Sequence, residues 1–272
     1  MNAQSRKNKA ILITGSARGL GKAMALALAR AGYGVAAIDL PSSAMEMDEL
    51  RKIAEAEGFS DLILPLEGDI THEYECHNLV KSAAEYFGRI HGLINNAARG
   101  MQDISAVLVG QRKKFYEVTP TDWVGVLNTN VNGPFLMARA ITPYLLTQGW
   151  GRIVNIVTSF NTMQAVGFSP YGPSKAALEA ATSIWSKDLA ETGVTVNALL
   201  PGRAANTRMI PSKEITDRAT LVQPEEMGPP VIWLMSEASN NITGKRFIAH
   251  KWEPPNSSEL NYQSLASAGF QV

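Results

Sequence analysis

The stretch Ala10-Ile11-Leu12-Ile13-Thr14-Gly15-Ser16-Ala17-Arg18-Gly19-Leu20-Gly21 joins a short apolar run to a glycine-rich turn. After the turn, apolar residues recur at helical spacing as far as Ala31, and Gly32 ends the run. The stretch therefore predicts a buried strand, a tight turn and a helix. Glycines in such a turn let a pyrophosphate approach the helix amino end, where free amides and the helix dipole favour an anion.

The alternation of strand and helix continues along the whole chain. Strand-like apolar runs lie at 35–40, 62–66, 92–96, 152–157, 195–200 and 244–249, and helical patterns lie at 49–57, 74–87, 121–139 (with a break at Pro134), 172–191 and 225–235. Apolar strands that alternate with long helices imply a parallel sheet covered on both faces. The expected fold class is α/β, a single doubly wound Rossmann-type domain with about seven strands.

Composition limits the classes of partner. The 272 residues are 45% apolar and 18% charged, with a formal net charge of zero, which gives no reason to expect a nucleic-acid or anionic-membrane partner. Cys76 is the only cysteine, which excludes an intrachain disulfide and fits a reducing compartment. No run is long enough to span a membrane. We expect a cytoplasmic protein.

Two polar clusters follow the predicted strand at 152–157. Thr158 and Ser159 come directly after it, and Tyr171 and Lys175 lie four residues apart on the next helix, so they share one face. A cation beside a phenol favours the phenolate and lowers the pKa of the tyrosine toward neutrality. The pair therefore indicates a general acid/base, although such pairs are also common on helices that have no catalytic role.

The Tyr171-x-x-x-Lys175 pair, the turn spacing Thr-Gly-x-x-x-Gly-x-Gly and the segment Asn95-Asn96-Ala97-Ala98 together resemble the short-chain dehydrogenase/reductase family, over about residues 8–250. Ala98 stands where glycine is usual in that family. The resemblance implies hydride transfer between a nicotinamide dinucleotide and an alcohol or carbonyl of a small substrate. It also implies a homotetramer or homodimer.

The resemblance assigns roles at the reaction centre. Tyr171 would be the acid/base, Lys175 would lower its pKa and hold the nicotinamide ribose, and Asn130 would fix a water in the proton relay. Thr158 has the family register for the hydroxyl that polarises the substrate oxygen. Ser159 is its neighbour, and either side chain can donate that hydrogen bond.

The glycine-rich turn and the second strand predict Gly15, Arg18, Gly19, Leu20, Gly21 and Asp39 as cofactor-binding residues, in addition to Tyr171 and Lys175. The resemblance implies the same role for Asp69, Ile70, Asn96, Pro201, Gly202 and Thr207. Asp39 ends the second strand, where a carboxylate accepts hydrogen bonds from the adenosine ribose and repels a 2'-phosphate. Asp39 thus favours NAD over NADP, whereas Arg18 could pair with that phosphate. No metal site is expected, because His72 and His77 have no cysteine or third histidine near them.

The domain is expected at 1–252, with a substrate lid at about 203–222 and a C-terminal tail at 253–272. Arg99, Arg203 and Arg208 fall on predicted crevice loops, so they indicate either an acidic or polyhydroxylated substrate or a solvated surface. Two other functions stay open. One is a 3-oxoacyl carrier-protein reductase that prefers NADP, and the other is a catalytically inactive dinucleotide-binding sensor or scaffold.

Overall fold

One parallel sheet of seven strands organises the computed structural model, which describes residues 9–104, 112–211, 215, 217–250 and 252–254. The strands are β1 (Ala10–Thr14), β2 (Gly34–Asp39), β3 (Ile63–Glu67), β4 (Gly92–Asn95), β5 (Gly151–Ile156), β6 (Val194–Leu200) and β7 (Arg246–Ile248). Their order is β3-β2-β1-β4-β5-β6-β7, and every neighbouring pair is parallel. This confirms the doubly wound α/β fold.

The strand order reverses between β1 and β4. From β1 the chain moves outward to β2 and β3, then returns to β4 and continues outward on the other side. In open α/β sheets, ligands bind beyond the carboxyl ends of the strands at such a reversal. The site is therefore expected beside the glycine-rich turn that follows β1.

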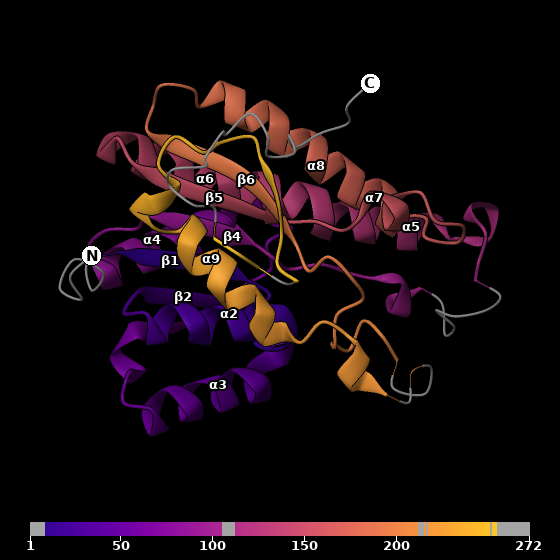
Figure 1. Ribbon diagram of the computed structural model, residues 1–272, viewed down its shortest axis with the longest axis horizontal. Coiled ribbons are helices and arrows are strands. Elements are labelled where there is room, and N and C mark those ends of the chain that lie inside the picture. The colour runs from indigo at the N-terminus through magenta and orange to yellow at the C-terminus, as the bar shows by residue number, and fades with distance from the viewer. Residues whose placement is uncertain (1–8, 105–111, 212–214, 216, 251, 255–272) are drawn as a thin grey trace.

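Helices cover both faces of the sheet (Figure 1). They are α2 (Gly19–Arg30), α3 (Ala44–Ala56), α4 (Glu73–Phe87), α5 (Pro120–Leu127), α6 (Gly133–Gln148), α7 (Phe160–Met163), α8 (Tyr171–Asp188) and α9 (Gly228–Leu234). Successive residues of β1 alternate between two apolar clusters: Ile11 and Ile13 pack with α2, α3 and α9, while Ala10 and Leu12 pack with α4 and α6. Both faces of the strand are buried, as its continuous apolar sequence predicts.

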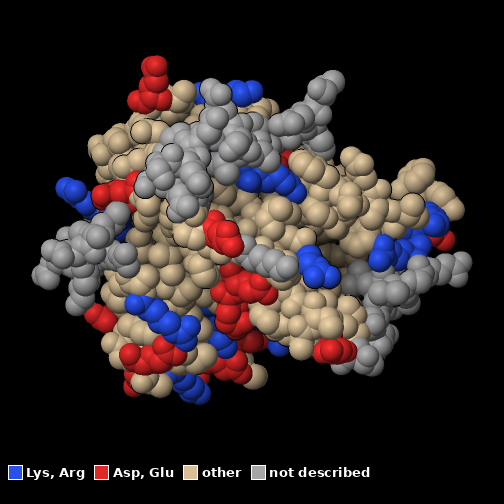
Figure 2. Space-filling model, in the orientation of Figure 1, with Lys and Arg blue, Asp and Glu red and all other residues tan. Residues whose placement is uncertain are grey.

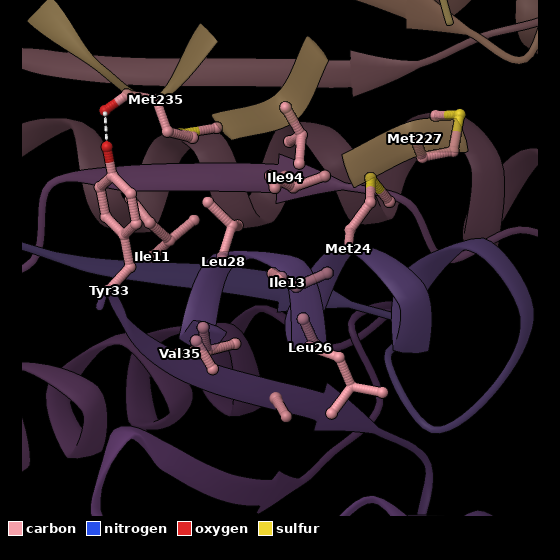
Figure 3. Close-up of a cluster of buried hydrophobic side chains, with 14 of the residues drawn as sticks. Ile11, Ile13, Met24, Leu26, Leu28, Tyr33, Val35, Ile94, Met227 and Met235 are labelled. Carbon is pink, nitrogen blue, oxygen red and sulfur yellow. Dashed lines mark hydrogen bonds between the residues drawn. The ribbon is translucent and has the colours of Figure 1, made fainter. Parts of the chain in front are cut away.

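The first of these clusters holds α2 in place. Figure 3 shows Met24 and Leu28 of α2 gathered with the side chains of Ile11 and Ile13, all of them fully buried. The Tyr33 hydroxyl, just after α2, donates to the carbonyl of Met235 at 3.4 Å. Each buried aliphatic side chain contributes roughly 1.5–3 kcal/mol. This packing fixes the amino end of α2 at the carboxyl end of β1.

The helix predicted from Thr121 to about Arg139 is wrong in its details. The α-helix α5 ends at Leu127, a π-helical turn follows at Asn128–Asn132, and α6 then runs without a break at Pro134 to Gln148. Pro134 lies in the first turn of α6, where a missing N–H is tolerated. Because Pro134 cannot donate to the carbonyl four residues earlier, the wider turn forms just before it.

Other predicted segments are confirmed with shifted ends. The helix expected at 225–235 begins as a 3-10 turn at Pro224–Met227 and continues as α9, and the last strand is confined to Arg246–Ile248. From residue 255 onward, the predicted tail lies outside the described residues, as do 212–214 and 216 of the predicted lid. Among the helices that the structure describes, none combines the length and the apolar character needed to cross a membrane.

Candidate active site

A cavity of about 1820 Å³ opens beside the carboxyl ends of β1, β4 and β5. All the sequence-predicted site residues line it except Gly21 and Asn130. The structure therefore brings together residues that are up to two hundred positions apart in the chain. On the face shown in Figure 2, both basic and acidic side chains occur, and neither sign covers the surface.

The glycine-rich turn forms one wall of the cavity. Gly15 and Gly19 have φ of +66° and +54°, in the left-handed region that favours glycine. A Cβ on Gly21 would lie 2.0 Å from the carbonyl oxygen of Gly15 and 2.6 Å from Nδ2 of Asn96. That Nδ2 donates to the carbonyls of Thr14 and Gly15, each at 2.9 Å. Asn96 therefore stabilises the turn by hydrogen bonds. Gly21 does not line the cavity, but its position has no room for a side chain.

The amino end of α2 is chemically suited to an anion. Its N-cap, Arg18, makes no side-chain capping hydrogen bond, and the first turn contains no acidic residue. The first amides of the helix therefore have no capping side chain, and the helix dipole adds a partial positive charge there. A pyrophosphate fits this corner of the cavity on chemical grounds.

Asp39 lies where the adenosine ribose is expected. Its Oδ2 accepts from the amide of Ala17 at 2.9 Å, and its Oδ1 accepts from the amide of Leu40 at 2.9 Å and from Ser43 Oγ at 3.0 Å. A carboxylate offers about four lone-pair sites, so about one acceptor position on Oδ2 is left for a hydroxyl. The same bonds hold the carboxylate in a fixed orientation.

Arg18 and Arg208 both lie against Glu46, a residue without a role predicted from the sequence. Arg18 NH1 donates to Ser43 Oγ at 3.1 Å and lies 3.7 Å from Glu46 Oε1, and Arg208 NH1 lies 3.0 Å from the same oxygen. The pKa of Glu46 is lowered by its own backbone amide and by these two arginines. Arg208 therefore lies at the same end of the cavity as Arg18, and Glu46 offsets the positive charge of both.

Asp69 and Ile70 line the cavity beyond β3. The Asp69 carboxylate accepts from the amide of Thr71 at 2.9 Å, and the Asp69 amide donates to Glu75 at 2.6 Å. The buried side chain of Ile70 packs so closely on Gly133 that a Cβ there would lie 2.7 Å from it. These contacts tie the loop after β3 to the start of α6.

Tyr171 and Lys175 lie on the first turns of α8 and are 8% and 3% exposed. Lys175 Nζ donates to the carbonyl of Ile156 at 2.7 Å and lies 5.9 Å from the centroid of the Tyr171 ring. Burial lowers the pKa of Lys175 to about 8 and raises the pKa of Tyr171 to about 12, and a hydrogen bond from Thr158 opposes the rise at Tyr171. The pKa of Tyr171 is raised, whereas the sequence predicts that it is lowered. Burial has the larger effect, because the Lys175 ammonium is directed at the Ile156 carbonyl.

Thr158 and Ser159 are in different environments. The Thr158 side chain acts on the Tyr171 phenol and lowers its pKa, against the larger effect of burial. Ser159 is the N-cap of α7: its Oγ accepts from the amide of Thr162 at 3.1 Å and lies 2.8 Å from the Thr162 hydroxyl. The geometry thus pairs Thr158 with the tyrosine and gives Ser159 a structural contact.

Asn130 lies in the π-helical turn and is completely buried. Its Oδ1 accepts from the amide of Arg99 at 2.8 Å, and its Nδ2 donates to the Arg99 carbonyl and to Ser174 Oγ, each at 2.9 Å. Ser174 Oγ in turn donates to the carbonyl of Tyr171 at 2.7 Å. The Asn130 side chain therefore links the loop after β4 to α8, the helix that carries Tyr171 and Lys175.

Pro201, Gly202 and Thr207 close the cavity on the side of β6. Thr207 lies against the glycine-rich turn, since a Cβ on Gly19 would be 3.2 Å from its methyl group. Arg218 holds this segment together by donating to the Asn206 side chain and to the carbonyls of Thr207 and Ile210, at 2.6, 2.9 and 3.1 Å. In the sequence, Arg218 is only a basic residue inside the expected lid, with no pattern that indicates this role.

Within the part of the chain that the structure describes, no group of three or more His, Cys, Asp or Glu side chains is placed to hold a metal ion.

Comparison with known proteins gives a consistent result. The family model for short chain dehydrogenase matches residues 9–217. The 3-oxoacyl-(acyl-carrier-protein) reductase FabG of Thermotoga maritima is 31% identical over 247 residues, which is 88% of this chain and 95% of that protein. The corresponding reductase of Synechocystis is 33% identical over 242 residues, covering 87% of this chain and 93% of that protein.

A solved short-chain dehydrogenase from Shigella flexneri, complexed with NADP, superposes with a TM-score of 0.76 at 25% identity and covers 89% of this chain and 97% of its own. A 3-ketoacyl-(acyl-carrier-protein) reductase from Brucella melitensis, complexed with NADH, shares the fold with a TM-score of 0.74 at 24% identity, covering 88% and 95% of the two chains. Fold, site and family model agree, and the chain is therefore a member of the short-chain dehydrogenase family, an oxidoreductase that acts on CH–OH or carbonyl groups with a nicotinamide dinucleotide.

Proposed function

We propose that this enzyme transfers hydride between NAD and an alcohol or carbonyl carbon of a small substrate, with Tyr171 as the acid/base. The observation that carries the proposal is the single cavity that Tyr171, Lys175 and Thr158 share with the glycine-rich turn. The inactive sensor or scaffold is disfavoured because the reaction pair is intact and the family is one of oxidoreductases.

The residues present fit a dinucleotide. The amides at the start of α2 would bind the pyrophosphate, the acceptor on Asp39 would bind a ribose hydroxyl, and Asp69 with Ile70 would border the adenine. Pro201, Gly202 and Thr207 would contact the nicotinamide end. The bound cofactor supplies the hydride, and the protein supplies orientation and proton transfer.

The protonation states favour carbonyl reduction near neutral pH. With a pKa of about 12, Tyr171 holds its proton and can donate it to a carbonyl oxygen. Lys175, with a pKa of about 8, remains mostly charged and can hold a ribose hydroxyl. In the oxidation direction Tyr171 must first lose its proton, so oxidation is expected to accelerate as the pH rises.

Thr158 is the better candidate for the hydroxyl that polarises the substrate oxygen. Its side chain lowers the pKa of Tyr171, which places the two groups close enough to face one substrate atom. Ser159 is engaged at the start of α7. We assign the role to Thr158 and a capping role to Ser159.

NAD is proposed over NADP because two carboxylates lie at the adenosine end. Asp39 would face a 2'-phosphate directly, and Glu46 already engages the two nearby arginines that could pair with such a phosphate. The solved relatives do not decide between the cofactors, since one is complexed with NADP and another with NADH.

A 3-oxoacyl thioester reductase is the second candidate. It is favoured by the relatives, which include 3-oxoacyl-(acyl-carrier-protein) reductases and an acetoacetyl-CoA reductase from Shinella zoogloeoides, 29% identical over 252 residues. Arg99 and Arg203 line the cavity and could contact an acidic or phosphate-bearing substrate. Arg208 is a poorer candidate for that role because Glu46 holds it at the adenosine end.

A homotetramer or homodimer is part of the proposal. The helices α5, α6 and α8 expose large apolar side chains, with Val124 52%, Phe135 49%, Leu146 44% and Ile184 56% exposed. A second copy could bury them at a gain of about 25 cal/mol per Å². Light scattering on Phe135→Glu and Ile184→Glu tests this, since both substitutions should lower the measured mass.

The reaction is tested by a screen of alcohols, hydroxy acids and 3-oxoacyl thioesters with NAD(H) and NADP(H). Tyr171→Phe should abolish turnover with the best substrate. The matched control is Tyr86→Phe, whose hydroxyl donates to the Asp61 carbonyl at 3.4 Å on an exposed part of α4 and should leave turnover unchanged. Full activity of Tyr171→Phe would overturn the acid/base assignment.

A further inference from the structure

A buried ion pair lies directly behind the proposed catalytic hydroxyl. Arg246 of β7 donates through NH1 to Glu179 Oε2 of α8 at 2.6 Å and through NH2 to the carbonyl oxygen of Thr158 at 2.7 Å. The guanidinium also lies 4.1 Å above the ring of Phe160. The side chains of Arg246 and Glu179 are 7% and 0% exposed. One guanidinium thus contacts the loop after β5, the start of α7 and the middle of α8.

Glu179 lies on the same face of α8 as Tyr171 and Lys175. Tyr171, Lys175 and Glu179 follow one another at intervals of four residues along α8, so their side chains lie above one another. Through Arg246, this face is joined to the backbone of Thr158 at a second place, in addition to the contact between Thr158 and Tyr171.

The backbone of Thr158 needs such a contact because it has left the sheet. The last ladder bond of this strand is from the amide of Val157 to the carbonyl of Leu199, at 2.9 Å. Lys175 binds the carbonyl of Ile156, the residue before Val157, and Arg246 binds the carbonyl of Thr158, the residue after it. Hydrogen bonds from charged donors are short and about twice as strong as neutral ones.

We propose that Arg246 is a positioning residue, which ties the carbonyl of Thr158 to Glu179 and so sets the direction of the Thr158 hydroxyl toward Tyr171. The inference rests on the role proposed above for Thr158. Among the described residues, Arg246 donates hydrogen bonds to Glu179 and to the Thr158 carbonyl, and Arg246 is not one of the residues that line the cavity. A misplacement of about 1 Å at a reacting group can lower turnover about a hundredfold.

Removing Arg246 alone would leave the Glu179 carboxylate buried and would destabilise the fold. The key variant is therefore the double substitution Glu179→Gln/Arg246→Met, which removes both charges. We expect it to recover most of the melting temperature that Arg246→Met loses, while its kcat stays about 10- to 100-fold below wild type. Affinity for the dinucleotide should be unchanged, because these side chains lie away from the proposed cofactor contacts.

Arg246→Lys should restore part of kcat, since a lysine can hold one of the two oxygens but cannot bridge them as the guanidinium does. Leu50→Ala is the stability control. Leu50 is a fully buried residue of α3 that does not line the cavity, so the substitution should lower the melting temperature and keep wild-type kcat. If kcat of the double variant returns with its melting temperature, Arg246 is structural only and the proposal fails.

A measurement without turnover separates this inference from the proposed function. Tyrosine labelled with carbon-13 at Cζ reports the hydrogen bond to the phenol, and Tyr171→Phe assigns the resonance. We expect the Tyr171 resonance to move in the double variant in the same direction as in Thr158→Val. A resonance that moves in Thr158→Val but stays at the wild-type position in the double variant would overturn the proposal, whatever the enzyme turns over.

Discussion

Lys175 should make the protein more stable as the pH rises above neutrality. Burial lowers its pKa from 10.5 to about 8. At about 1.4 kcal/mol per pKa unit, the ammonium disfavours the folded state by about 3 kcal/mol at pH 7, where both folded and unfolded chains are protonated. Between the two pKa values the unfolded chain binds a proton that the folded protein has released, so the free energy of unfolding rises with pH.

The size of the effect follows from the same two pKa values. From pH 7 to about pH 9.5 the Lys175 contribution should rise by about 2 kcal/mol. The range stops there because the raised pKa of Tyr171 acts in the opposite direction above its unfolded value of 10, where the folded protein retains a proton that the unfolded chain has lost. Lys175→Met removes this pH dependence. The substitution also removes the hydrogen bond from Lys175 to the Ile156 carbonyl, which lowers the free energy of unfolding by an amount that does not vary with pH.

The assay is urea unfolding followed by the fluorescence of the five tryptophans, at several pH values, on wild type and Lys175→Met. The difference between the two free energies of unfolding should change by about 2 kcal/mol across the range, with wild type gaining stability. Lys187→Met, at an exposed position on the same helix, is the control and should run parallel to wild type. If Lys175→Met also runs parallel, the ammonium is not desolvated and the description of the site is wrong.

Gly21→Ala should abolish measurable NADH binding, because its Cβ would lie 2.0 Å from the Gly15 carbonyl oxygen and must displace the turn; wild-type affinity by fluorescence titration would contradict this. Thr158→Val should lower kcat by about 10²- to 10³-fold, as the loss of one donor to a reacting oxygen does. Ser159→Ala should keep wild-type kcat. If steady-state kinetics show the reverse, the roles of Thr158 and Ser159 are exchanged. Glu46→Gln should tighten NADPH binding several-fold and leave NADH binding unchanged, because it frees Arg18 from its carboxylate partner; equal effects on both cofactors would remove Glu46 from cofactor choice.

The sequence predicted the parts of the site that are built from local patterns. The turn from Gly15 to Gly21 is framed by a strand and a helix that each show their own periodicity. Tyr171 and Lys175 share a helix face whatever the rest of the chain does. Thr158 follows from the register of the family that the sequence resembles. For these residues, the spacing along the chain decides the spacing in space.

The remaining features depend on contacts between distant segments. Arg246 and Thr158 are 88 residues apart, and nothing in the sequence around either one indicates the other. Glu46 lies on a helix of ordinary polar pattern, and only the fold brings it between Arg18 and Arg208. The direction of the Tyr171 pKa was mistaken for the same reason, since burial is a property of the packed site and not of the helix face.

Titration of the wild-type protein with NADH and with NADPH, followed by nicotinamide fluorescence, tests the proposed activity most directly. The carboxylate of Asp39, oriented by three hydrogen bonds, predicts tight binding of NADH and weak binding of NADPH. Tighter binding of NADPH would contradict the NAD assignment and would mean that Arg18 and Arg208, not Asp39, decide the choice of cofactor. It would also favour the 3-oxoacyl thioester reductase as the function. Binding of neither dinucleotide would contradict the oxidoreductase account itself.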